Sequence, residues 1–183
     1  MDVNVGLPEI DEPEMLVRAI KTVQGVLNIP LQIDTSDFEA MEKALRIYNG
    51  KALINSANGK KESMEKVFPL AKKYGGVVVC LTLDENGIPD TAQGRIEIAK
   101  RMIKTAESYG LSKDDLIIDA LAMTVSTGKD NAKVTLETLD YVRNTLGVNT
   151  CLGVSNISFG LPSREIINTA FFTMAMHSGL SAG

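Results

Sequence analysis

Small polar side chains stand between an apolar strand-like run and a helix-like run in the segment "GVSNISFGLPSR", residues 153–164. Ser155 and Asn156 follow the apolar run directly, and Arg164 comes shortly after them. Ser and Asn after a strand are ordinary helix caps, so this turn alone is a weak signal of chemistry. Its weight depends on whether other strand-like runs end in the same way.

The other strand-like runs do carry such residues. They cover residues 2–6, 30–35, 52–57, 76–84 and 115–121, and each has Asp or Asn at or near its end. The polar residues of these runs are Asp2, Asn4, Asp34, Asn55, Ser56, Asp84 and Asp119. If these ends converge, they form a pocket rich in carboxylates and carboxamides and poor in cations.

A pocket of this composition suits a neutral, flat heterocycle such as a pterin. A carboxylate accepts from two neighbouring N–H donors in one plane, and an Asn side chain both donates and accepts. No lysine stands at the end of a strand-like run, which argues against a Schiff-base aldolase. The single histidine, His177, cannot build a histidine-based zinc site or a Ser/His/Asp triad. We therefore expect a small organic ligand and no metal.

Amphipathic helical segments alternate with the strand-like runs, which predicts a parallel α/β architecture. We expect one helix to open with a capping box at Ser36 and Glu39, and another to begin at Asp90 and end at Gly110. No strand leads into a glycine-rich nucleotide-binding turn. A barrel of eight units takes about 250 residues, so six units take roughly 190. The 183 residues therefore predict about six of the eight βα units of a (β/α)8 TIM barrel, with residues 1–183 forming one partial domain that lacks the first and eighth strands.

Composition narrows the environment and the partners. The net charge is −4 and no run of Lys or Arg is longer than two, so we expect no nucleic-acid partner. No apolar run approaches the ~20 residues of a membrane span, and the first residues do not resemble a signal peptide. Cys80 and Cys151 lie in apolar runs and are expected to be buried free thiols. These features predict a cytoplasmic protein.

Six stretches together resemble the pterin-binding barrel of the methyltetrahydrofolate:corrinoid methyltransferases, and are closest to members of the methionine synthase type. They are "DVNVG", "QIDTSD", "ALINSA", "CLTLDENGIP", "IIDAL" and "GVSNISFGLPSR". The last is the most specific, whereas "IDT" and "INS" are shared with the wider dihydropteroate synthase-like group. The resemblance implies a dihydropteroate synthase-like TIM barrel that binds 5-methyltetrahydrofolate. It also implies transfer of the N-5 methyl group to the cobalt of cob(I)alamin or another corrinoid, carried by a partner domain or protein.

The resemblance also implies roles for single residues. Asp34, Asn55 and Asp119 match positions that hydrogen-bond the pterin ring. Asn156 matches the residue beside N-5 and is the expected catalytic group. Further matches line the pocket or follow the specific turn, namely Asp2, Asn4, Ser155 and Arg164. The chain departs from some family members at Ala120, where they have proline after the aspartate; the carboxylate is kept, but the residue that sets the backbone direction after it differs.

The proposed role of Asn156 has a physical reason. A tertiary amine is a poor leaving group, and a hydrogen bond to N-5 that strengthens as the methyl group departs lowers the barrier. A carboxamide can accept from a protonated N-5 and donate to an unprotonated one. We expect no covalent enzyme intermediate and no dedicated acid with a shifted pKa.

Three other readings stay open from the residues. The chain could be a methyltransferase that serves a corrinoid iron–sulfur protein, a dihydropteroate synthase-like enzyme, or a pterin-binding fragment without activity. A dihydropteroate synthase needs cationic groups for a pterin pyrophosphate, and the "SNISFGLPSR" turn argues against it. The residues do not distinguish folate from methanopterin as the substrate, and they do not show whether the corrinoid lies in the same chain or on another protein. They also leave open the oligomeric state and whether the fragment alone is active.

Overall fold

A computed structural model describes all residues of the chain, 1–183. Its centre is a six-stranded sheet in which every neighbouring pair is parallel and the strands follow one another in chain order. The strands are β1 (Asp2–Val3), β2 (Gln32–Asp34), β3 (Leu53–Asn58), β4 (Val77–Leu81), β5 (Leu116–Asp119) and β6 (Asn149–Cys151).

A helix follows each strand. The α-helices are α1 (Glu12–Val26), α2 (Phe38–Ile47), α3 (Lys61–Tyr74), α4 (Ala92–Ser108), α5 (Asn131–Asp140) and α6 (Arg164–His177). Short helical turns are η1 (Lys113–Asp115), η2 (Tyr141–Leu146), which continues α5, and η3 (Val154–Ser158) before α6. No helix combines the length and the apolar character needed to cross a membrane.

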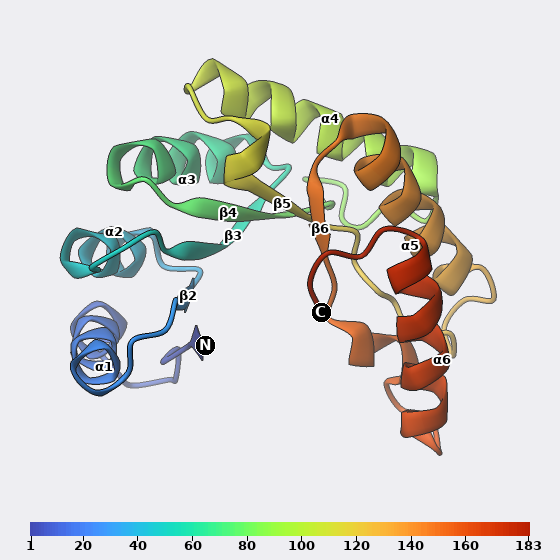
Figure 1. Cartoon of the computed structure of the whole chain (residues 1–183), viewed down its shortest axis with the longest axis horizontal. Helices are drawn as coiled ribbons and strands as arrows, with labels where there is room; N and C mark the ends of the chain where they lie inside the picture. Colours follow the sequence, from blue (N-terminus) through green and yellow to red (C-terminus); the bar gives the residue numbers. More distant parts are fainter.

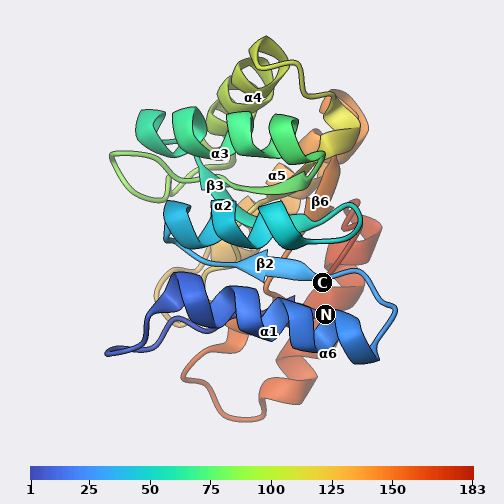
Figure 2. The same ribbon diagram turned by 90° about the vertical axis from the view of Figure 1, so that its left-hand side faces the viewer.

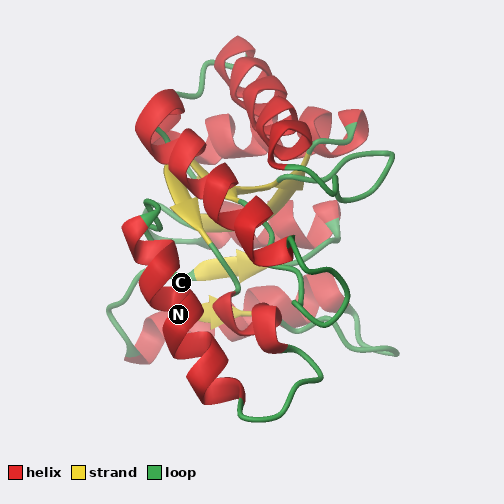
Figure 3. Ribbon diagram, turned by 90° about the vertical axis from the view of Figure 1, so that its right-hand side faces the viewer, coloured by secondary structure: helices red, strands yellow, loops and turns green.

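The sheet is curved, and the helices cover its outer side (Figure 1). From one side, α1, α2 and α3 lie next to one another over the strands (Figure 2). From the opposite side, helices again cover the strands (Figure 3). A parallel sheet that curves inside a layer of helices is part of a (β/α)8 barrel, and six consecutive units of it are present. The predicted fold class is confirmed.

Alternation along the strands decides which side chains face the helices. Ile33, Ile54, Val78 and Ile118 are completely buried and belong to a core of 28 residues between sheet and helices. Because successive strand residues point to opposite faces, their neighbours face the concave side. The parallel register sets Asp34 beside Asn55, and Asp119 beside Cys151. Polar strand residues thus gather on the inner face.

Residues 181–183 pair with the outer edge of β6. Ala182 forms a parallel bridge with Cys151, and the amide groups of Ser181 and Ala182 donate to the carbonyl of Thr150 at 3.1 and 3.0 Å. The sequence predicted no strand-like residues after the last helix. The tripeptide was too short to carry an apolar pattern, yet its backbone begins a further parallel strand.

Two helix starts differ from the prediction by one residue. Asp37, not Ser36, caps α2, because its Oδ1 accepts from the amides of Glu39 and Ala40 at 2.8 and 3.1 Å. Thr91, not Asp90, caps α4 through a hydrogen bond from the Gly94 amide to its Oγ1. In both cases adjacent residues are good caps, and backbone direction decides between them.

Candidate functional site

Three polar side chains form a hydrogen-bonded group where β1, β2 and β3 end. Asp34 accepts from Asn4 Nδ2 at Oδ2 over 2.9 Å and from Asn55 Nδ2 at Oδ1 over 3.0 Å. Asn4 Oδ1 in turn accepts from the amide of Gly6 at 3.0 Å. The carboxylate therefore holds two carboxamides at once, one from each neighbouring strand. Each carboxylate oxygen keeps a lone pair for a further donor.

The loop after Asp34 is held by its own contacts. Thr35 is buried, and its hydroxyl donates to Glu12 Oε1 at the start of α1. The same hydroxyl accepts from the amide of Asp37 at 3.0 Å, which leads into α2. The loop is thereby tied to both helices that flank β2. These contacts fix the backbone directly after Asp34.

Asp119 ends β5 on the same inner face. Its Oδ1 accepts from the amide of Leu121 at 2.8 Å, and burial raises the pKa of the carboxyl to about 6. The Leu121 hydrogen bond and the Arg95 charge act against that rise in pKa. Nothing in the sequence indicated a carboxyl with a raised pKa at this position, and the structure shows no role for Asp119 as a dedicated acid. The second carboxylate oxygen is free to meet a ligand.

Two adjoining hollows share Asn55. One, of about 390 Å³, lies on the inner face of the sheet and is lined by Asn55, Asp119, Cys151 and Gly153 among others. The other, of about 360 Å³, lies over the ends of β2 and β3 and includes Asp34 and Asn55. Both volumes fall in the range of about 300–1,000 Å³ found for small-molecule sites. The inner hollow contains no Lys or Arg, whereas Lys60, two residues after β3, lines the hollow that holds Asp34. We call the inner hollow the inner cavity.

Asn156 lies in η3, at the rim of the inner cavity. A Cβ placed on Gly153, which lines the cavity, would come within 2.9 Å of Asn156 Nδ2, so the carboxamide rests directly on that glycine. Asn156 is exposed, and its backbone carbonyl accepts from the amide of Phe159 at 3.2 Å. It does not line the inner cavity itself. It stands beside the opening.

Arg164 and Ser155 have structural contacts in the same turn. Arg164 donates from Nη2 to the carbonyl of Ser155 at 2.9 Å and from Nε to Ser158 Oγ at 3.1 Å. Ser158 Oγ also contacts Asn168 Oδ1 at 2.7 Å. The guanidinium thus ties α6 to η3 on the side away from the cavity. Ser155 is exposed and lines a separate surface hollow with Phe172. The structure does not bring these two residues into the inner cavity.

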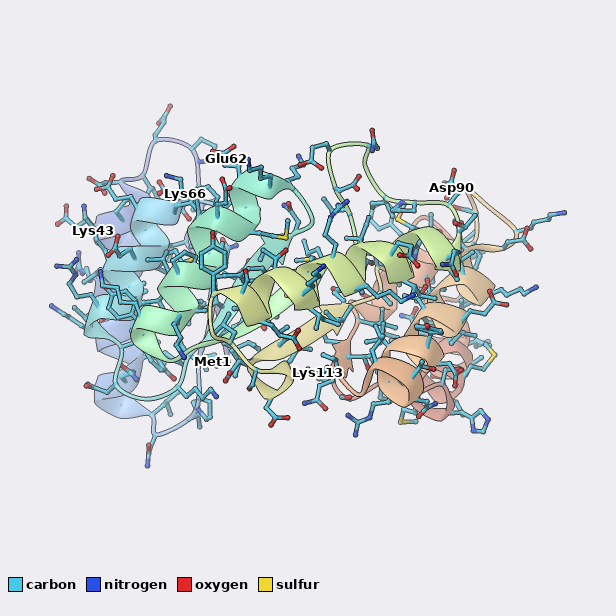
Figure 4. All side chains as sticks on the ribbon, turned by 90° about the horizontal axis from the view of Figure 1, so that it is seen from above. Met1, Lys43, Glu62, Lys66, Asp90 and Lys113 are labelled. Atoms are coloured by element: carbon cyan, nitrogen blue, oxygen red, sulfur yellow. The ribbon has the colours of Figure 1, made fainter.

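Asp2 and Asp84 also lie apart from the site. Asp2 is level with Gln32 near the strand starts, and its Oδ1 accepts from Gln32 Nε2 at 2.9 Å. In Figure 4, Met1 and Lys113, which precede strands, lie toward one edge, whereas Glu62 and Asp90, which follow strands, lie toward the other. β4 ends at Leu81, so Asp84 falls in a loop and pairs with Arg101 at 2.8 Å. The sequence placed both carboxylates at the ligand end, because it showed each strand longer than it is.

Sequence reasoning missed Arg95. This residue of α4 is 1% exposed, and its guanidinium contacts the carbonyls of Ala120 and Leu121 just after Asp119. A signal was present, since Arg95 occupies the same helical stripe as the buried Ala99 and Met102. A charged residue inside an apolar stripe is expected to have a dedicated set of partners.

The match to a family model runs over residues 3–183, and that model is described as a pterin-binding enzyme. The chain belongs to the pterin-binding enzyme family. It is 32% identical over 191 aligned residues to a methionine synthase of Mycobacterium leprae, covering 97% of this chain and 16% of that protein. It is 31% identical over 188 residues to a methylcorrinoid:tetrahydrofolate methyltransferase of Eubacterium limosum, covering 100% of this chain and 68% of that protein.

Dihydropteroate synthases are among the solved structures of similar fold. That of Thermus thermophilus has a TM-score of 0.73 and 19% identity, with 99% of this chain and 74% of that chain covered. That of Vibrio fischeri has a TM-score of 0.69 and 20% identity, with 98% and 69% covered. At this identity the likeness establishes the TIM-barrel fold. The relatives of higher identity are named as a methionine synthase and a methylcorrinoid:tetrahydrofolate methyltransferase, and neither is named as a dihydropteroate synthase.

Proposed function

We propose that this chain binds 5-methyltetrahydrofolate and carries out methyl transfer between its N-5 atom and the cobalt of a corrinoid. The observation that carries the proposal is the Asp34 group. One carboxylate holds Asn4 and Asn55 through their amide nitrogens. Asp34 lines the adjoining hollow, and Asn55 also lines the inner cavity, which contains Asp119 and no Lys or Arg. The proposal is supported by the methyltransferase relatives at 31–32% identity.

The free hydrogen-bonding atoms fit a pterin. Because Asn55 uses Nδ2 toward Asp34, its Oδ1 is left as an acceptor for the ligand. Asp119 has one oxygen free, and Asp34 retains lone pairs on both oxygens. A pterin ring carries neighbouring N–H and NH₂ donors, which such acceptors bind in one plane. Asp34, Asn55 and Asp119 are the proposed ring contacts, with Asn4 orienting Asp34.

Asn156 is the proposed catalytic residue. It stands at the rim of the inner cavity with its carboxamide on Gly153, where the reacting edge of a bound ring would meet it. A hydrogen bond to N-5 gains strength as the nitrogen becomes the leaving group, and such an interaction accelerates the reaction. Arg164 keeps this turn in place through Ser155 and Ser158.

The corrinoid is proposed as the second substrate, presented by a partner domain or protein. Asn156 and Phe159 in the η3 turn are exposed, so a large planar partner can approach the rim. The name of the Eubacterium limosum relative describes transfer from a methylcorrinoid to tetrahydrofolate. The same contacts serve both directions, because both pass through the same transition state.

Calorimetry with 5-methyltetrahydrofolate tests the binding step. Absorbance of cob(I)alamin mixed with the protein and this folate tests transfer, because methylation of the cobalt changes the corrinoid spectrum. We expect saturable binding and loss of the cob(I)alamin spectrum that requires both protein and folate. Binding without transfer would support a pterin-binding module alone. If neither binding nor transfer is observed, the proposal is rejected.

Dihydropteroate synthesis is the second candidate, favoured by the likeness in fold to solved synthases. It requires condensation of a pterin pyrophosphate with p-aminobenzoate. The absence of Lys and Arg from the inner cavity disfavours a pyrophosphate there. Formation of dihydropteroate from these two substrates would establish this candidate, and its absence beside active methyl transfer would exclude it.

A further inference from the structure

Arg95 makes a set of contacts that converge on the chain segment after Asp119. Nη1 lies 2.8 Å from the carbonyl of Ala120 and 2.6 Å from that of Leu121, and Nε lies 2.9 Å from the carbonyl of Pro89. The hydroxyl of Thr135 lies 3.3 Å from the same Nη1 and 3.2 Å from the Leu121 carbonyl. One buried cation thus joins the loops after β4 and β5 to helix α5.

Leu121 needs such support. Its φ is 60°, in the left-handed region that a branched side chain rarely occupies. Its amide donates to Asp119 Oδ1 at 2.8 Å, while its carbonyl receives the Arg95 guanidinium. A residue in this conformation persists only where its surroundings fix it. Without the guanidinium, the Leu121 amide is free to turn away from Asp119.

The charge of Arg95 has no carboxylate in direct contact. Its acceptors are three carbonyls and one hydroxyl, and burial lowers the pKa of the guanidinium while the charges of Asp90 and Asp119 oppose that effect. The titratable groups around Asp119 are Arg95 on α4 and Cys151 on β6. Burying an arginine without a carboxylate partner costs free energy. The buried position of Arg95 is explained if Arg95 also holds the chain segment that orients Asp119.

We propose that Arg95 is a positioning residue for Asp119: through the carbonyls of Ala120 and Leu121 it fixes the Leu121 amide, and this amide fixes the carboxylate on the inner face. The effect of Arg95 on ligand affinity rests on the proposed function, in which Asp119 contacts the pterin. The effect of Arg95 on the loop and on the Asp119 carboxyl is independent of the proposed function. The two parts can therefore be tested separately.

The variant that tests the proposal is Arg95→Lys, with Arg95→Gln as the neutral partner. A single ammonium group cannot reach the Pro89 and Leu121 carbonyls together as a guanidinium does. Hydrogen exchange of the Leu121 amide should accelerate at least tenfold in Arg95→Lys, while the amides of Ile117 and Ile118 in β5 keep their rates. In Arg95→Gln, ¹³C NMR of the Asp119 carboxyl should show a titration midpoint raised by about one pH unit, because the opposing charge is lost.

Met102→Ala is the control for general loss of stability. Met102 is buried on the same helix but belongs to the 28-residue core and not to the separate cluster that contains Ala120, so its removal should leave the Leu121 amide and the Asp119 midpoint unchanged. Unchanged Leu121 exchange in a folded Arg95→Lys protein would overturn the proposal. If Arg95→Gln does not fold, the exchange measurement on Arg95→Lys decides alone.

Titration of 5-methyltetrahydrofolate separates this proposal from the proposed function. We expect Arg95→Lys to raise the dissociation constant about tenfold while Met102→Ala leaves it within twofold. Faster Leu121 exchange with unchanged pterin affinity would support the positioning role and reject Asp119 as a pterin contact. Unchanged exchange together with weaker binding would reject the positioning role.

Discussion

Asn55 donates from Nδ2 to Asp34 Oδ1 over 3.0 Å, and this contact decides which end of the Asn55 carboxamide faces the ligand. With the nitrogen held by Asp34, the oxygen is the end that remains for a ligand. The second Asp34 oxygen holds Asn4 in the same way at 2.9 Å. The Asp34 carboxylate therefore has two roles in the pocket. It can accept hydrogen bonds from a ligand, and it orients the carboxamides of Asn4 and Asn55.

Asp34→Asn should weaken binding of 5-methyltetrahydrofolate about 10- to 100-fold, because hydrogen bonds to charged groups contribute about 1.5–3 kcal/mol. The new NH₂ group would face a donor, so either Asn4 or Asn55 loses its partner. Asp37→Asn is the matched control, since it makes the same change in charge three residues away and an Asn still caps α2. Calorimetry measures both variants. Equal affinities for the two would contradict the role of Asp34.

The strand pattern predicted which face of the sheet these polar side chains occupy. Asp34, Asn55 and Asp119 each stand in a strand whose alternate residues are buried, so the inner face could be assigned from the sequence. Asp2 lies outside the site because a pattern of alternation cannot show at which level of the barrel a residue stands, and the register with Gln32 decides that. Asp84 lies outside the site because β4 ends three residues earlier, at Leu81, and Asp84 then falls in a loop and pairs with Arg101 of α4.

The turn around Asn156 shows a second limit. Its small polar residues marked it as special, but they could not separate residues that face the ligand from residues that hold the turn. Arg164 and Ser155 hold the turn, because the Arg164 guanidinium at the start of α6 donates a hydrogen bond to the backbone carbonyl of Ser155. Contacts between side chain and backbone of this kind depend on the path of the chain and leave no periodic pattern in the sequence.

Asn156→Ala should lower the rate of methyl transfer about 10²- to 10³-fold, as loss of one transition-state hydrogen bond does elsewhere. Pterin affinity should change little, because the interaction strengthens only as the methyl group leaves. Asp119→Ala should chiefly weaken binding instead. Single-turnover rates and equilibrium binding separate the two effects. Asn144→Ala, at an exposed position on η2, is the control. Equal losses of rate and affinity in Asn156→Ala would make Asn156 a ground-state contact.

Asp119 should make the stability of the protein depend on pH. Burial raises its pKa from 3.8 to about 6, so the folded protein keeps this proton up to about pH 6 while the unfolded chain releases it near pH 3.8. The folded state binds more protons between these values, and its stability relative to Asp119→Asn falls as the pH rises from 4 to 7. The change amounts to about 2 kcal/mol after allowance for solvent screening of a half-buried group.

Urea unfolding of wild type and Asp119→Asn between pH 4 and 7.5 measures this difference. Asp115→Asn is a control of opposite sign, because the Lys51 contact and the Ser112 amide lower the pKa of Asp115 to about 2. Stability from Asp115 is present above pH 3.8 and is lost only as the pH falls toward 2. Asp115→Asn should therefore show a constant offset from wild type over the measured range. A constant offset for Asp119→Asn as well would show that its carboxyl titrates normally.

Gly153→Ala tests the position of Asn156 without removing any polar group. The backbone at Gly153 has φ −74°, which alanine adopts freely, so the substitution brings no backbone strain. The new methyl group would lie 2.9 Å from Asn156 Nδ2, a distance at which the carboxamide must move. We expect the methyl-transfer rate to fall at least tenfold, with stability within about 1 kcal/mol of wild type. Gly25→Ala is the matched control, because an added Cβ there meets nothing within 4 Å.

The two glycine variants differ in what the added methyl group meets, so their comparison isolates the Asn156 contact. Gly25 is the next-to-last residue of α1, where alanine should stabilise the helix by less than the roughly 0.5–1 kcal/mol expected in mid-helix, and the transfer rate should be unchanged. In Gly153→Ala, further substitution of Asn156 by Ala should cause little additional loss of rate, because the displaced carboxamide has already left its place. Additive losses in the double variant would mean that Asn156 still acts after displacement, and that its contact with Gly153 does not set its catalytic position.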